Sequence, residues 1–173
     1  CGKTTLKELL GETLRKFSKV SISPKSYNNK YGVPLSLLNL RENDEFGVLE
    51  VGMDKKGEID YLTRIIQPDV SVITNINFAH AKNFKNIKQI AFAKSEIIQN
   101  TKHGGLVVLN ADDHFFDLHK KIAIRNNLRV ISFGIKNKNS SVKFLKIKNK
   151  GKFYRLYIEF NKLKKYFLVS NNF

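Results

Sequence analysis

Val70-Ser71-Val72-Ile73-Thr74-Asn75-Ile76 is a short, mostly apolar run rich in β-branched residues, and it follows the break at Pro68-Asp69. A stretch with apolar residues at helical spacing comes next, at 87–100, and then a second apolar run at 106–110. Apolar runs of this length are typical of strands buried on both faces of a sheet. The order strand, helix, strand therefore predicts two parallel strands joined by a crossover helix.

The same alternation continues on both sides of this unit. Helices are predicted at 3–18, 34–40, 57–66, 87–100 and 113–126, and strands at 20–22, 46–51, 70–76, 106–110 and 129–133. We expect an α/β fold with a mostly parallel sheet flanked by helices. After Gly134 three alternating runs follow with Lys-rich turns and no helix between them, at 142–147, 153–160 and 166–169. Residues 1–135 are thus the predicted core, and 136–173 a small antiparallel β extension of the same domain.

Length and composition limit the class of protein. The 173 residues suffice for one domain with a core, and 42% of them are hydrophobic, as in soluble globular proteins. No apolar run approaches the roughly 20 residues that span a bilayer. We expect a cytoplasmic protein, because Cys1 is the single cysteine and no signal peptide is visible. Since the sequence opens inside a phosphate-binding pattern, we also expect a preceding segment.

The formal net charge of +16 allows two interpretations. A basic surface could bind nucleic acid. However, the chain has 25 Lys and only six Arg, whereas recognition of base edges favours the Arg fork, and no RNA-binding motif is present. We therefore expect no nucleic-acid partner and attribute the charge to a general richness in lysine.

Gly2-Lys3-Thr4-Thr5 stands directly before an amphipathic helix and matches the last part of a P-loop. Backbone N–H groups at a helix N-terminus point at an anion, and a glycine lets the backbone approach it closely. A lysine at this place can neutralise phosphate oxygens, and a threonine hydroxyl can bind Mg²⁺. The alternative is a polar helix start without a ligand.

Polar residues occur where the apolar runs stop: Glu50, Thr74, Asn75, His80 and Asn110. The carboxyl ends of parallel strands share one edge of the sheet, where ligands bind. Glu50 is a hard oxygen ligand suited to Mg²⁺, or else an ion-pair partner or helix cap. A single histidine such as His80 is more often a structural or surface residue than a ligand, because it carries no ligand spacing.

Lys94 lies in the middle of an apolar helical stripe. The stripe consists of Ile87, Ile90, Ala91, Lys94, Ile97 and Ile98. Lysines are rarely buried without a partner, so this one should reach solvent, pair with an acid or be chemically modified.

Several short segments, in this order and spacing, resemble the Mur ligase family of peptidoglycan synthesis. They are Cys1–Thr5, Lys25–Leu37, Leu49–Met53, Gly57–Ile59, Pro68–Val70, Thr74–His80, Ala93–Ile97 and Asn110–Asp113. The stretch Tyr27-Asn28-Asn29 to Gly32-Val33-Pro34 resembles the members that add D-alanyl-D-alanine. The family pattern often has Gly-Asn where this chain has Lys25-Ser26.

The resemblance implies an ATP-dependent ligase. ATP would phosphorylate the terminal carboxylate of UDP-N-acetylmuramoyl-tripeptide, and the amine of D-alanyl-D-alanine would attack the acyl phosphate. An N-terminal domain for the UDP-sugar and a C-terminal domain for the amine would lie outside this chain, so the chain alone should be inactive. The full-length enzyme is expected to be a monomer in the bacterial cytoplasm. ATP and two Mg²⁺ ions are the implied cofactors.

The resemblance also implies roles for single residues. Lys3 would hold the phosphates, Thr4 and Glu50 one Mg²⁺, and His80 with a carbamylated Lys94 the second Mg²⁺. The remaining implied contacts are Gly2, Thr5 and Asn75 to ATP, Asn110 to adenine, and Tyr27, Asn28 and Asn29 to the peptide substrate. Other interpretations stay open: a different Mur ligase, a folylpolyglutamate synthase-like ligase, or a non-catalytic P-loop nucleotide-binding module.

Overall fold

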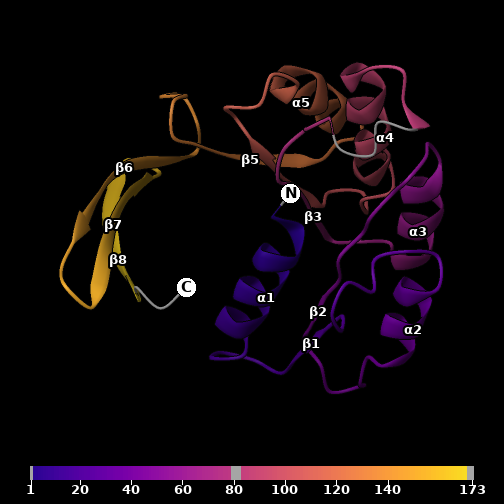
Figure 1. Ribbon diagram of the computed structural model, residues 1–173, viewed down its shortest axis with the longest axis horizontal. Coiled ribbons are helices and arrows are strands. Elements are labelled where there is room, and N and C mark those ends of the chain that lie inside the picture. Colours follow the sequence, from indigo (N-terminus) through magenta and orange to yellow (C-terminus); the bar gives the residue numbers. More distant parts are fainter. Residues whose placement is uncertain (1, 79–82, 171–173) are drawn as a thin grey trace.

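The computed structural model describes residues 2–78 and 83–170. Helices and strands alternate up to β5, and only strands follow (Figure 1). The elements in chain order are α1 (Lys3–Leu14), β1 (Val20–Ile22), α2 (Gly32–Leu38), β2 (Phe46–Val48), α3 (Glu58–Ile66), β3 (Val70–Ile73), α4 (Ile87–Gln99), β4 (Leu106–Asn110), α5 (Phe116–Arg125), β5 (Arg129–Gly134), β6 (Val142–Asn149), β7 (Phe153–Phe160) and β8 (Leu163–Ser170).

The strands form two hydrogen-bonded sheets. β1 and β2 pair in parallel by themselves, and the six-stranded sheet has the order β3-β4-β5-β6-β7-β8. The pairings from β3 to β6 are parallel, whereas β6, β7 and β8 are antiparallel neighbours. These three strands stand to one side of the core in Figure 1. The expected α/β fold with an antiparallel appendage is confirmed; the separate β1-β2 sheet was not predicted, and the domain boundary at 135 stays a prediction.

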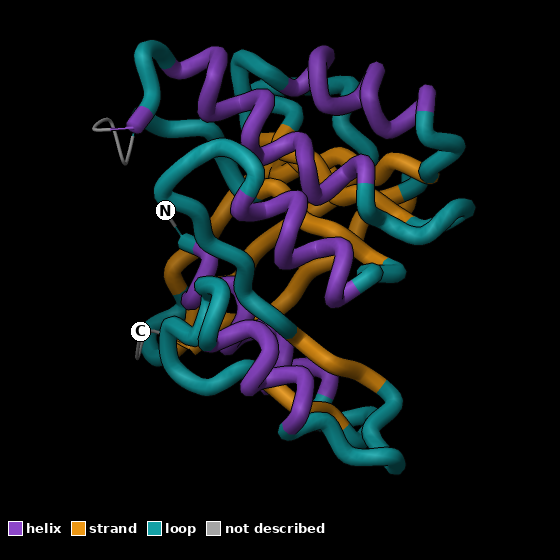
Figure 2. The backbone as a smooth tube through the Cα atoms, turned by 90° about the vertical axis from the view of Figure 1, so that its right-hand side faces the viewer, coloured by secondary structure: helices purple, strands orange, loops and turns teal. Residues whose placement is uncertain are grey.

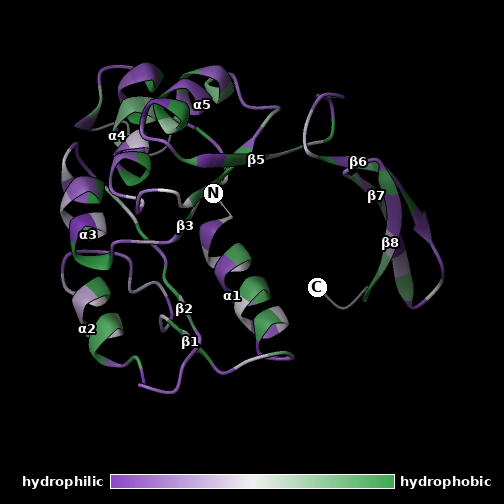
Figure 3. Cartoon of the chain, turned by 180° about the vertical axis from the view of Figure 1, so that it is seen from behind, coloured by the Kyte–Doolittle hydropathy of each residue, from purple (hydrophilic) through white to green (hydrophobic). Residues whose placement is uncertain are grey.

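The core lies between the parallel strands and the helices α4 and α5. Its fully buried members include Ile90 and Ile98 of α4, Val107 and Leu109 of β4, and Ala123 of α5. Both helices have hydrophobic and hydrophilic parts (Figure 3), and helices lie on both sides of the strands in Figure 2. Along β4 buried residues alternate with partly buried ones, so one face of this strand packs into the core more closely than the other. None of the described helices has the length and apolar character that crossing a membrane requires.

Polar side chains shift two element boundaries from the predicted ones. β2 ends at Val48, not at 51, and beyond it the Glu50 N–H donates to Ser23 Oγ at 3.2 Å. α5 begins at Phe116, not at 113, because Asp113 Oδ1 accepts the Phe115 N–H at 2.9 Å. Such side-chain bonds compete with the regular backbone pattern and end it.

Asp112 organises the turn that leads to the β appendage. Its carboxylate accepts backbone N–H groups of Ile135 at 2.6 Å, Lys136 at 3.0 Å and Asn137 at 2.7 Å. Desolvation opposes ionisation here, but these three donors outweigh it and hold the pKa of Asp112 below its usual value. A Cβ on Gly134 would lie 2.9 Å from Asp112 Oδ1, so the close approach requires a residue without a side chain.

Glu96 of α4 is a buried carboxylate that holds the start of α3. It accepts the N–H groups of Gly57 at 2.9 Å and Asp60 at 3.0 Å. Replacing Glu96 by Ala should lower the free energy of unfolding by about 1–3 kcal/mol, because these buried donors lose their acceptor. Urea unfolding of the protein measures this, with Glu42→Ala at an exposed position as control. Equal midpoints for the two variants would contradict the prediction.

Candidate functional site

The amino-terminal end of α1 is shaped to receive an anion. Gly2 has a φ of 74°, a left-handed conformation that a side chain would oppose, and a Cβ there would meet nothing within 4 Å. Helix α1 begins at Lys3 directly afterwards, without a side-chain cap. Its first N–H groups and the partial positive charge of the helix end therefore face the same space as the Lys3 side chain.

Glu50 connects three segments at this helix end. Its carboxylate, only 3% exposed, accepts the Thr4 hydroxyl at 2.7 Å and the Asn28 amide at 2.9 Å, and the Lys3 ammonium lies 4.0 Å away. A hydroxyl and a carboxylate in contact are the oxygen ligands that Mg²⁺ prefers. The donor set therefore fits a magnesium ion beside a phosphate held at the start of α1.

Lys94 reaches the end of β3 from α4. Its Nζ donates to the Asn75 carbonyl at 2.7 Å. Burial lowers the pKa of Lys94, the nearby positive charge of Lys3 lowers it further, and Asp113 acts in the opposite direction. The predicted conflict between an apolar stripe and a lysine is thus resolved by a backbone carbonyl.

One open cavity of about 890 Å³ brings five of the expected site residues together. Lys3, Asn28, Asn29 and Lys94 all line it, together with Asn75. They come from α1, the segment after β1, the segment after β3, and α4. The wall also contains Tyr31, whereas Tyr27 is not one of the described residues that line the cavity.

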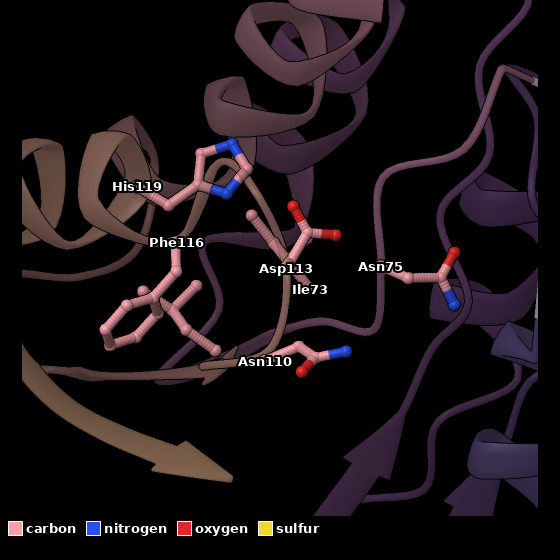
Figure 4. Close-up of a pocket in the computed structure, with 7 residues that line it drawn as sticks. Ile73, Asn75, Asn110, Asp113, Phe116 and His119 are labelled. Carbon is pink, nitrogen blue, oxygen red and sulfur yellow. The ribbon is translucent and has the colours of Figure 1, made fainter. Parts of the chain in front are cut away.

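Asn110 and Asp113 stabilise the polypeptide after β3. The Asn110 amide donates to the Thr74 carbonyl at 3.1 Å, and Asp113 Oδ2 accepts the Ile76 N–H at 2.7 Å. Both side chains line a small hollow together with Asn75 (Figure 4). Asp113 was not predicted as a site residue from the sequence. Its position three residues after the end of an apolar run could have indicated it, because polar residues just beyond strand ends lie at the ligand-binding edge of the sheet.

The expected ligands of the second magnesium ion are His80 and a carbamylated Lys94. His80 lies outside the described residues, so its expected role as a ligand has no geometry here. Within residues 2–78 and 83–170, no group of three or more His, Cys, Asp or Glu side chains could hold a metal ion. Carbamylation of Lys94 and a second magnesium ion stay predictions as well.

The profile of the Mur ligase middle domain matches residues 1–168. The chain belongs to the Mur ligase family. In this Mur ligase middle domain Lys3 and Lys94 line the same cavity, and Glu50 lies 4.0 Å from the Lys3 ammonium.

Individual Mur ligases are similar to the chain in sequence and in structure. The UDP-N-acetylmuramoyl-tripeptide–D-alanyl-D-alanine ligase of Buchnera aphidicola (subspecies Acyrthosiphon pisum) is 40% identical over 141 residues, which are 82% of this chain and 30% of that protein. A MurF crystal structure from Acinetobacter baumannii superposes with a TM-score of 0.89 at 30% identity, covering 98% of this chain and 36% of that one. MurF from Thermotoga maritima in complex with ADP gives 0.85 at 30% identity, covering 98% and 38%. The chain thus spans about a third of these proteins.

Proposed function

We propose that this chain is the ATP-binding part of a ligase that adds D-alanyl-D-alanine to UDP-N-acetylmuramoyl-tripeptide. The arrangement around Glu50 carries the proposal, because it joins the start of α1 through Thr4 to the Asn28 segment in one hydrogen-bonded group. The name of the Buchnera relative and the ADP complex of the Thermotoga relative support it. The monomeric state and cytoplasmic location stay predictions.

The chain's own residues would act by positioning and by neutralising charge. The helix N-terminus and Lys3 bind and orient the β- and γ-phosphates, with Gly2 and Thr5 beside them. Thr4 and Glu50 would hold magnesium, which supplies charge neutralisation for phosphoryl transfer when it is bound. Asn75 and Asn110 would contact the nucleotide, and Asn28 and Asn29 the peptide. The peptide carboxylate would take the γ-phosphoryl group and release ADP, and attack of the amine on the acyl carbon would then form the amide and release phosphate.

A substrate panel tests this proposal on the full-length enzyme. Phosphate release should require UDP-N-acetylmuramoyl-tripeptide and D-alanyl-D-alanine together, because the two substrates complete one reaction. With single D-amino acids, L-amino acids or glutamate in place of D-alanyl-D-alanine, kcat/KM should fall by at least on the order of 10²-fold. Preferred addition of a single amino acid would point to a different Mur ligase, and preferred addition of glutamate to a folate derivative would point to a folylpolyglutamate synthase-like enzyme.

A further inference from the structure

Lys7 is a buried lysine in the first helix of the site. It lies four residues after Lys3 on α1, and only 3% of the residue is exposed. A lysine in the interior is costly unless its ammonium has partners, so its retention at this position calls for an explanation. None of the phosphate, metal or substrate roles described above uses it.

Lys7 has two backbone partners near Pro24 and one side-chain partner next to it on α1. Its Nζ donates to the Ser23 carbonyl at 2.6 Å and to the Lys25 carbonyl at 2.5 Å, and pairs with Glu8 Oε1 at 2.9 Å. An ammonium group has three donors, and these contacts use all of them. Two of the three contacts therefore hold the backbone on either side of Pro24.

This backbone belongs to the segment 23–31, whose last four residues, 28–31, line the cavity. Lys25 has a φ of 45°, a left-handed conformation that a residue with a side chain adopts only when its surroundings hold it there. Ser23 Oγ accepts the Glu50 N–H, and five residues later Asn28 donates to the Glu50 carboxylate. The Asn28 carbonyl in addition accepts the Gly52 N–H at 2.7 Å.

We infer that Lys7 is a positioning residue that ties the segment 23–31 to α1 and thereby sets Asn28 and Asn29 against the cavity. The helix that begins at the phosphate site and the segment expected to meet the peptide are thus held as one unit. The statement that Asn28 and Asn29 meet the peptide substrate rests on the proposed function. The link itself depends only on the contacts of Lys7.

Kinetics of the full-length enzyme test the role in catalysis. Lys7→Met keeps the length of the side chain and removes the donors, so the KM for UDP-N-acetylmuramoyl-tripeptide should rise at least about 10-fold. The KM for ATP should change less than about 3-fold, because Lys3 and the helix start are retained. Lys7→Arg should recover part of the loss, and Lys16→Met, at an exposed position beyond α1, should behave like the wild type.

Trypsin cleavage after Lys25 and Lys30 tests the link without reference to any reaction. In Lys7→Met these bonds should be cut on the order of 10-fold faster, because the segment opens more often. Lys7→Gln replaces this variant if it is not recovered folded. An unchanged cleavage rate would overturn the inference. Faster cleavage with an unchanged peptide KM would support the positioning role and instead contradict the peptide contact in the proposed function.

Discussion

Replacing Lys94 by Ala should lower kcat/KM of the full-length ligase about 10³-fold, the largest loss expected for one residue of this chain. The Lys94 ammonium group lies against the Asn75 carbonyl in the cavity that Lys3 also lines. Burial and Lys3 lower its pKa, which raises the fraction of neutral amine that can react with CO₂ to a carbamate. A carbamylated side chain would supply an anionic ligand for the second magnesium ion.

The rescue of this variant distinguishes a ligand from a packing residue. A short-chain carboxylic acid should restore part of the activity of Lys94→Ala, because it can enter the vacated space and supply the missing carboxylate. Lys88→Ala, at an exposed position of the same helix, should keep wild-type rates with or without the acid. Steady-state phosphate release at several acid concentrations measures both. A Lys94→Ala enzyme with nearly full activity would show that Lys94 does not supply a ligand for the catalytic metal.

Replacing Glu50 by Gln should lower kcat/KM about 10²- to 10³-fold and raise the magnesium concentration needed for half-maximal rate. The amide keeps the size of the side chain and can still bond with Thr4 and Asn28, but it removes the negative charge beside Lys3. The thermal unfolding midpoint should therefore stay close to that of the wild type, although the rate falls.

Magnesium titrations at saturating ATP separate this effect from a loss of fold. Glu12→Gln is the matched control, because Glu12 lies on the same helix as Thr4 and forms an exposed pair with Arg15. It should leave both the rate and the magnesium dependence unchanged. A Glu50→Gln enzyme with the wild-type magnesium dependence would show that this carboxylate does not hold the metal.

The pattern of apolar runs was sufficient to predict the order of the elements and their approximate ends. In the run 106–110 Val107 and Leu109 are buried in the core, whereas the other residues of the run are only partly buried. The site could be predicted only as a list of polar residues at strand ends. Contacts between residues far apart in the chain, such as Thr4 with Glu50 and Lys7 with Ser23, leave no periodic signal.

The α/β alternation, the P-loop-like start of α1 and the lysine in the apolar stripe of α4 can be predicted from the chain, since each depends on residues that are close together in it. Three features become visible only in the folded protein: the contact of Lys94 with the Asn75 carbonyl, the bond between Asn28 and Glu50, and the separate sheet of β1 and β2. They depend on packing, because a buried polar group takes whichever partner distant segments bring within hydrogen-bonding distance.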